Sequence, residues 1–187
     1  MVHMQTDPTS PVLAHVSANV RRLRIGANLS QAALADRSGI SRRTVVKLEA
    51  GEANISLTGL DHLAEALGVA FVDLIAAPTA PRSDINEVAW KGRAAGSLAM
   101  LLASVPASKD AQLWTWVLAP GDRYDAEPDP MGWSEMLHVS EGALHVVKQD
   151  GDVTLRTGDH LAFPTDQQYA YVNEESASTR FVRIVVR

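Results

Sequence analysis

The sequence LSQAALADRSGISRRTVVKLEAG at residues 29–51 decides the fold of the N-terminal part of the chain. Gly39 divides it into two short helical segments, because glycine adopts the positive φ of a tight turn without steric strain. Ala35 is small enough for the two helices to approach each other closely. The apolar positions that lock one helix against the other are Leu34, Ile40, Val45 and Leu48. The pattern predicts two helices packed across a turn, and the exposed positions of the second are Arg42, Arg43, Val46 and Lys47.

Further helices are predicted on both sides of this stretch. Apolar residues recur three or four positions apart from Leu13 to Leu23, which is the spacing of one helix face. Thr58, followed three positions later by an aspartate, resembles the capping box that begins a helix, and Gly68 ends that helix. The short apolar run Phe71–Ile75 predicts a fifth helix. We therefore expect a five-helix bundle over residues 10–76.

Charge is distributed unevenly along the chain. The net charge is −5, yet residues 15–56 carry seven Arg or Lys against three Asp or Glu, whereas residues 78–187 carry ten basic and fifteen acidic side chains. A locally basic segment on an acidic chain indicates a negatively charged partner for that segment. Arginine can bind guanine in the major groove and lysine can reach phosphates or base edges. Double-stranded DNA is therefore the predicted partner.

With these residues, the segment 29–51 resembles the phage-repressor-type (XRE) helix-turn-helix family, and the resemblance extends over about residues 15–76. In that family the glutamine that begins the second helix helps to position the protein on DNA, which implies this role for Gln31. The base-reading positions of the family fall on Ser41, Arg42, Arg43 and Thr44, with Lys47 one turn further along. The alternative is an ordinary helical hairpin with a solvated basic face.

The chain changes character after residue 76. Residues 77–84 contain two prolines and mostly small residues, as an interdomain linker does. In residues 85–187, short apolar runs alternate with turn residues at a spacing of about 8–12 residues, which predicts a sandwich or small barrel. The predicted strands are Val88–Trp90, Leu113–Leu118, Met136–Val139, Ala143–Val147, Val153–Leu155, His160–Phe163, Tyr169–Val172 and Phe181–Val186. The expected fold class is thus a two-domain α+β chain.

Several classes of protein are excluded by composition. The chain has no cysteine, which rules out disulfides, thiolate zinc sites and a cysteine nucleophile. No apolar run approaches the ~20 residues that cross a bilayer. Residues 1–11 lack the basic stretch and apolar core of an export signal. We expect a cytoplasmic protein without a membrane partner.

Two spaced patterns in the second half resemble the cupin family, whose fold is a double-stranded β-helix or jelly-roll barrel. The first has Gly121, Glu135 and Gly142, and the second has Gly158, Pro164 and Asn173. The order of these residues follows the family motifs, but the interval from Asp129 to Glu135 is one residue longer than in the family. The family binds its metal through three histidines and the glutamate, since imidazole and carboxylate suit transition metals. At those positions this chain has Glu127, Asp129, Glu135 and Tyr169. The resemblance therefore implies the cupin fold without its metal, and we expect no cofactor.

A small-molecule pocket is the prediction for this domain. Tyr169, Tyr171 and Asn173 share one strand face by alternation, and Tyr169 stands at the histidine position of the family motif. With Glu135 and Asp129 they would form a polar-edged pocket for a cationic or hydroxyl-rich ligand. The alternative is a filled barrel that serves for dimerisation.

Together these features predict a transcriptional regulator rather than an enzyme. Two helix-turn-helix domains on a homodimer would bind a near-palindromic operator, and the cupin domain would dimerise and sense a small-molecule effector. One alternative is a cupin-type enzyme with an appended DNA-binding domain, for which Glu135 and Tyr169 are the candidate acid–base pair. Another is an antitoxin-like protein whose barrel binds a second protein.

Overall fold

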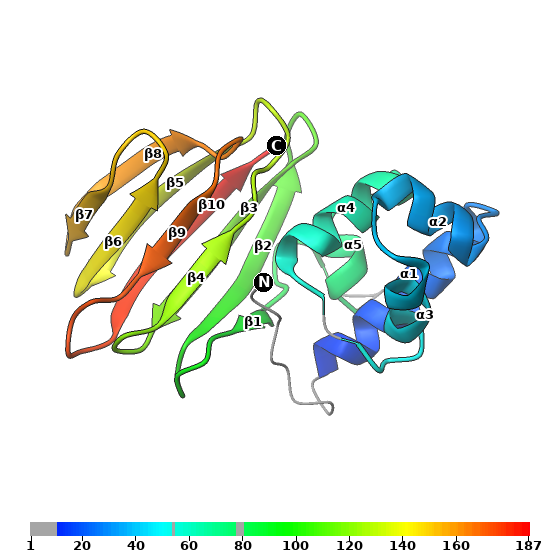
Figure 1. Cartoon of the computed structure of the whole chain (residues 1–187), viewed down its shortest axis with the longest axis horizontal. Helices are drawn as coiled ribbons and strands as arrows, with labels where there is room; N and C mark the ends of the chain where they lie inside the picture. Colours follow the sequence, from blue (N-terminus) through cyan, green and yellow to red (C-terminus); the bar gives the residue numbers. More distant parts are fainter. Residues whose placement is uncertain (1–10, 54, 78–80) are drawn as a thin grey trace. The chain divides into compact units, whose positions relative to one another are not determined.

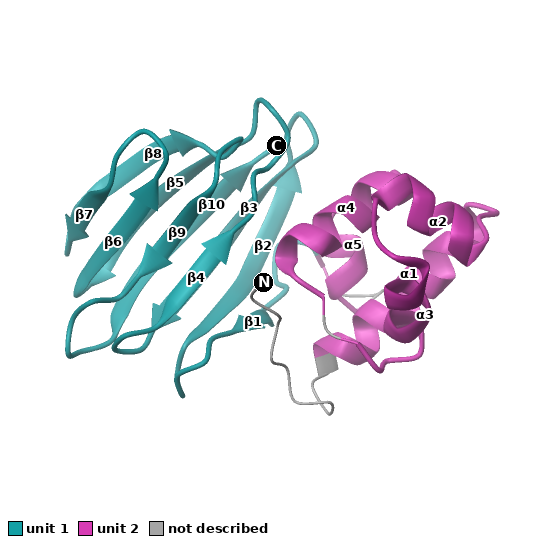
Figure 2. Ribbon diagram, in the orientation of Figure 1, with its two compact units in different colours: residues 1–2, 82–187 teal, residues 3–81 magenta. Residues whose placement is uncertain are grey.

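The structure, a computed structural model, describes residues 11–53, 55–77 and 81–187. The chain forms two compact units that divide between Pro81 and Arg82 (Figure 2). The predicted boundary at residue 10 and residues 78–80 of the predicted linker lie outside the described residues. Within the described ranges, no helix combines the length and hydropathy needed to span a membrane.

The N-terminal unit is helical. Its helices are α1 (Pro11–Gly26), α2 (Gln31–Ser38), α3 (Arg42–Glu49), α4 (Leu57–Leu67) and α5 (Val72–Ile75). The predicted five-helix bundle is only partly correct, because α5 has four residues and adds a single turn to the packing of four helices. The predicted capping box at Thr58 is wrong by two residues. Ser56 caps α4 instead, since its Oγ accepts a hydrogen bond of 3.0 Å from the Gly59 amide.

The core of this unit comes from apolar residues at helical spacing. Val16, Val20, Leu34, Val45 and Leu60 are all completely buried. Buried Asn19 of α1 adds a polar connection, because its Nδ2 donates to the carbonyl oxygens of Leu74 and Ala76 at 3.1 and 2.9 Å. These bonds fix the end of α5 against α1, and the apolar pattern of the sequence gave no indication of them.

The C-terminal unit is a β-sandwich of two antiparallel sheets (Figure 1). The strands are β1 (Glu87–Lys91), β2 (Leu98–Pro106), β3 (Asp110–Leu118), β4 (Arg123–Ala126), β5 (Ser134–Glu141), β6 (Ala143–Lys148), β7 (Val153–Arg156), β8 (His160–Pro164), β9 (Tyr169–Val172) and β10 (Thr179–Val186). One sheet has the order β1-β2-β3-β10-β5-β8 and the other β4-β9-β6-β7. The expected barrel is therefore an open sandwich, since among the described residues no backbone pairing closes one sheet onto the other.

All eight predicted apolar runs lie in strands, but β2 and β4 were not predicted. The sequence of β2, LAMLLASVP, is almost continuously apolar and lacks the alternation of a half-buried strand. In β4 the alternation is present, with Tyr124 and Ala126 buried, yet Arg123 and Asp125 make so short a segment look like a loop.

Aromatic side chains fill the space between the two sheets. The Trp116 ring lies 5.2 Å from that of Trp90, 4.8 Å from that of Tyr124 and 5.7 Å from that of Phe181, centroid to centroid. Tyr171 joins the cluster at 5.6 Å from Trp116. The interior is thus packed by large rings, and its polar groups lie among them.

Candidate nucleic-acid interface and sandwich interior

The N-terminus of α3 is fixed by its own side chains. Gly39 ends α2 with a φ of 69°, which lets the chain turn directly into α3. Ser41 caps α3, because its Oγ accepts a hydrogen bond of 3.1 Å from the Thr44 amide. The hydroxyl groups of Ser41 and Thr44 are also hydrogen-bonded to each other at 2.8 Å. Two of the predicted base-reading residues therefore also hold the end of the helix.

The outer face of α3 presents three cations. Arg42, Arg43 and Lys47 are exposed, and none of them forms an ion pair with another described residue. Successive residues of a helix are rotated by about 100°, so Arg43 lies at the centre of the exposed arc, with Val46 and Lys47 on either side one turn further along. Val46 is 41% exposed. Such a face can bind guanine and phosphate through its cations and contact a thymine methyl group through Val46.

A buried carboxylate connects the first three helices. Glu49 at the end of α3 accepts hydrogen bonds from Nε and Nη2 of Arg24 in α1, at 2.6 and 2.9 Å. It also accepts one of 2.9 Å from Nε2 of Gln31, the first residue of α2. A further bond of 2.8 Å joins Nη1 of Arg24 to the Leu29 carbonyl. We call Arg24, Gln31 and Glu49 the helix clamp; the sequence predicted only Gln31 of the three.

The charges of the clamp are mutually stabilised. Burial raises the pKa of Glu49, but the hydrogen bonds from Arg24 and Gln31 outweigh this effect and leave its pKa below the usual value. The hydrogen bond to Glu49 raises the pKa of Arg24. One N–H of the Gln31 amide is used by Glu49, and the other is available for a phosphate oxygen.

Inside the sandwich, Glu135 of β5 forms the centre of a second polar cluster. Its side chain is completely buried. Tyr169 donates a hydrogen bond of 2.7 Å from Oη to Oε1, and Tyr171 donates one to Oε2. Arg183 of β10 forms an ion pair with the carboxylate and donates to Oε1 from Nε at 2.6 Å. We call these four residues the Glu135 cluster; the sequence predicted three of them and missed Arg183.

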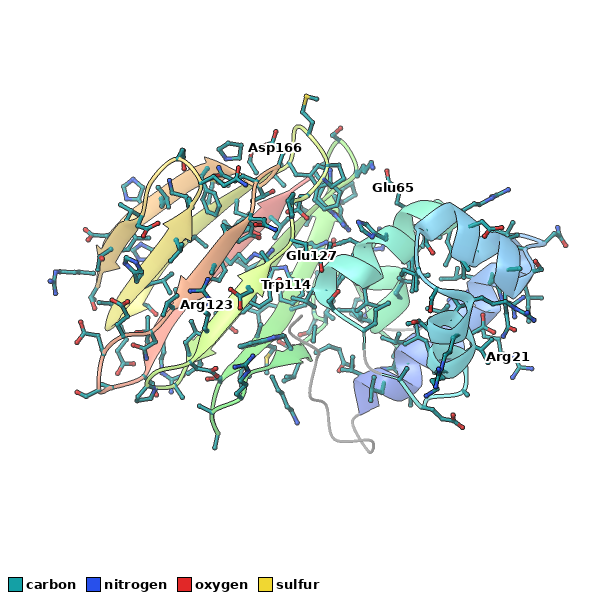
Figure 3. All side chains as sticks on the ribbon, viewed as in Figure 1. Arg21, Glu65, Trp114, Arg123, Glu127 and Asp166 are labelled. Carbon is teal, nitrogen blue, oxygen red and sulfur yellow. The ribbon has the colours of Figure 1, made fainter. Side chains whose placement is uncertain are left out.

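Aromatic rings hold the guanidinium of Arg183 in place. Its Cζ lies 5.7 Å from the ring centroid of Trp114, which Figure 3 labels, and 5.5 Å from that of Trp116. Burial lowers the pKa of Arg183, but the electrostatic interactions with Glu135 and with Tyr169, Tyr171 and Tyr124 together raise it by more, so the pKa lies well above the usual value. Burial, reinforced by the Glu135 charge, raises the pKa values of Tyr169 and Tyr171 well above their usual value. Both phenols therefore remain protonated donors.

Comparison with known protein families assigns each of the two units to a family. A helix-turn-helix family matches residues 20–74, and a cupin domain family matches residues 114–186. The chain is an XRE-type helix-turn-helix protein with a C-terminal cupin domain. No curated protein sequence matches it significantly.

Solved structures similar to the chain include a transcriptional regulator of the same helix-turn-helix family from Vibrio cholerae. The two sequences are 20% identical, and the alignment covers 94% of this chain and 97% of the regulator. The TM-score is 0.68. A second similar structure is the cupin domain of an XRE family transcriptional regulator from Enterobacter cloacae. Its sequence is 22% identical, the alignment covers 49% of this chain and 96% of that domain, and the TM-score is 0.46. At these identities the likeness concerns the fold.

The cupin domain does not offer the metal site of its family. Glu127, which Figure 3 labels, is exposed. Both oxygens of Glu135 accept hydrogen bonds within the Glu135 cluster. A buried guanidinium already supplies positive charge next to this carboxylate. Among the described residues, no group of three His, Cys, Asp or Glu side chains is arranged to hold a metal ion. The residues present thus do not fit the metal.

Two predicted pocket residues lie outside the Glu135 cluster. Asn173 bonds to the backbone instead, because its Nδ2 donates to the carbonyls of Leu118 and Ala177 at 2.9 and 2.8 Å and its Oδ1 accepts from the Glu175 amide. It holds the turn after β9. Asp129 is half-buried, and burial raises its pKa although the Thr165 hydroxyl and the positive charge of Arg183 act to lower it.

Proposed function

We propose that this protein is a sequence-specific DNA-binding transcriptional regulator that acts as a homodimer on a near-palindromic operator. The observation that carries the proposal is the outer face of α3, where Arg42, Arg43 and Lys47 are exposed and form no ion pair with any residue that the structure describes. Exposed cations at the start of a helix-turn-helix recognition helix suit the major groove. The rest of the chain is acidic on balance, so this face is where DNA is attracted.

Each residue has a distinct role in the proposed complex. Arg43, at the centre of the exposed arc, bonds a guanine through O6 and N7, and Arg42 reaches the neighbouring base or phosphate. Lys47 extends to phosphates or base edges one turn along. Gln31 contacts the DNA backbone with its remaining amide N–H, while Glu49 fixes its orientation. The helix clamp thereby orients a backbone contact relative to the base-reading helix.

The test begins with selection of operator sequences from random DNA by the full-length protein. Arg43→Ala is expected to weaken operator binding by about 1–3 kcal/mol and to relax the preference at one base position, and Arg42→Ala should behave likewise. Arg156→Ala, which removes an equal charge from an exposed position of β7, is the control and should bind as the wild type does. Equal weakening by Arg43→Ala on operator and random DNA would show that Arg43 touches only phosphate.

Salt provides an independent check of the electrostatic part. Neutralising phosphates with Arg and Lys releases counterions, so the logarithm of affinity falls linearly with the logarithm of salt concentration. We expect a steep slope for the wild type and a slope smaller by about one for Lys47→Ala. Fluorescence anisotropy between about 50 and 200 mM salt measures both. A flat dependence would contradict binding through this face.

For the cupin domain we propose effector sensing without catalysis. The candidate acid–base pair, Glu135 and Tyr169, is buried and bonded within its own cluster, which argues against turnover at these residues. Asp129 is the candidate ligand contact, because it is half-buried, interacts with the charges of Arg183 and Glu135, and has its pKa raised by burial, as carboxyl groups of many binding sites do. Native mass spectrometry of the protein as purified is the test. An added mass of a few hundred daltons, lost in Asp129→Ala, supports sensing, and no added mass favours a cupin domain kept for dimerisation.

A further inference from the structure

One face of the six-stranded sheet is buried against the four-stranded sheet, and the other face is apolar without being buried. Along β3, the buried residues Gln112, Trp114 and Trp116 alternate with Leu113 and Thr115, which point the other way and are not buried. The same alternation holds along β5 and β10. A strand that is apolar on both sides is expected where both faces are covered.

The strand register places these outward residues in continuous rows across the sheet. Ile184 of β10 pairs with Leu113 of β3 and with Met136 of β5. The row continues to Ala103 of β2 and Ala162 of β8. Five strands thus contribute one uninterrupted apolar row.

The two neighbouring rows run through Val182 and Val186. They consist of Val, Ala, Met, Thr, Ser and Pro, and the Val182 row ends in His138 opposite His160 at the β5–β8 edge. No Asp, Glu, Lys or Arg lies in these three rows, which are composed entirely of described residues. We call the three rows the Ile184 face.

Large side chains of this face are open to solvent in the single chain. Val105 is 54% exposed, Met136 44% and Leu113 37%. Isolated exposed apolar residues are ordinary, but a contiguous apolar patch on a soluble protein marks an interaction surface. The continuity of the rows makes this a patch.

We propose that the Ile184 face is the homodimer interface, with the six-stranded sheets of two copies packed face to face. This inference rests on the proposed function, which requires a dimer, and adds the surface that forms it. A two-fold interface brings the same patch of both copies together, so any net charge on it would repel itself. The Ile184 face has no such charge, although residues 78–187 as a whole carry fifteen acidic against ten basic side chains. A neutral apolar face in an acidic domain suits a second copy of this chain.

The dimensions of the face support a stable dimer. Five strands about 4.8 Å apart and three rows about 6.8 Å apart give a flat footprint of roughly 24 by 20 Å, or about 480 Å². The accessible area of the projecting side chains exceeds the flat footprint, and the rim adds further residues. The face thus reaches the roughly 500 Å² per partner, about 1,000 Å² in total, that a specific interface should exceed.

The test compares the same substitution at two methionines. Met136→Glu places a carboxylate within the Ile184 face, whereas Met131→Glu places it in the turn before β5, where Met131 is 88% exposed. Sedimentation equilibrium of the full-length protein should give a dimer for the wild type and for Met131→Glu. Met136→Glu and Leu113→Glu should each raise the dimer dissociation constant at least 100-fold, because each dimer would bury two carboxylates. Circular dichroism verifies that all variants are folded.

Cysteine protection gives a second readout that does not depend on charge. The chain has no cysteine, so a single Leu113→Cys or Met131→Cys introduces one thiol. The thiol at 113 should react with a maleimide far more slowly at dimer-forming concentrations than after dilution, and the thiol at 131 should react equally fast at both.

The outcomes separate this inference from the proposed function. The Ile184 face is not the dimer interface if the wild type is monomeric or if the Met136→Glu protein dimerises normally. If a monomeric wild type binds a different protein through Leu113, the face belongs to that partner. Failure of the wild type to bind any selected DNA overturns the regulator proposal but leaves the dimer measurement intact. A folded, monomeric Met136→Glu that binds a single half-site as the wild type does supports both.

Discussion

At the scale of single residues, Glu135 is a buried charge on which the stability of the cupin domain depends. Its carboxylate is the charged partner of the buried Arg183 guanidinium. Replacing one member of a buried ion pair leaves the other charge without compensation, at a cost of about 3–5 kcal/mol. We therefore expect Glu135→Gln to lower the free energy of unfolding by about that amount, measured by urea denaturation with the tryptophan fluorescence of this domain as the signal.

The matched control removes both charges. In Glu135→Leu/Arg183→Leu no uncompensated charge is left, so most of the lost stability should return. Tyr171→Phe removes one hydrogen bond to a charged group and should cost about 1.5–3 kcal/mol. A Glu135→Gln protein as stable as the wild type would contradict the interpretation that the buried carboxylate compensates the charge of Arg183.

The Glu135 cluster also shows which residues of a site can be predicted from sequence. The spacing of the cupin motifs placed Tyr169 near Glu135, because motif positions map onto known neighbours in the fold. Arg183 has no motif, and it lies 48 residues from Glu135. Its contact depends on β10 lying beside β5, a strand order that periodicity along the chain does not specify. Asn173 lies outside the cluster for a related reason, since β9 ends at Val172 and strand alternation does not extend beyond it.

At the scale of the helices, the helix clamp makes the helix-turn-helix domain sensitive to acid. The pKa of Glu49 is lower in the folded protein than its usual value, so its stabilising effect is complete above the unfolded-state pKa of about 4.3 and is lost as the pH falls through the folded-state pKa. We expect the helical unfolding temperature of the wild type to fall as the pH is lowered from about 6 towards 3, and the fall to be smaller in Glu49→Gln. Far-UV circular dichroism measures both unfolding temperatures.

Glu52→Gln changes an exposed carboxyl group and is the control, so its unfolding temperature should fall with pH as that of the wild type does. If the unfolding temperatures of Glu49→Gln and wild type fall equally with pH, the helix clamp does not contribute the predicted stability.

Elements were predicted well where the determining contacts are local. The turn between α2 and α3 follows from Gly39 and the Ser41 cap, both within a few residues of the helices they define. The strand β2 escaped prediction because its outward side chains are apolar like its inward ones. The apolar outward side chains of β2, which hid its alternation, are also part of the Ile184 face.

At the scale of the whole molecule, the two proposals together fix how the DNA site is arranged. A dimer held by its cupin domains carries two recognition helices, which read two half-sites on one face of the duplex about 34 Å apart, one helical turn. Insertion of 5 base pairs between the half-sites rotates one of them by about half a turn, so we expect cooperative binding to be lost and the affinity to fall to that of a single half-site. Insertion of 10 base pairs restores the facing and should recover part of the affinity. Met136→Glu should be insensitive to both insertions, because a monomer binds each half-site separately. Equal affinity of the wild type for all three spacings, measured by fluorescence anisotropy, would mean that the two recognition helices do not bind one operator together.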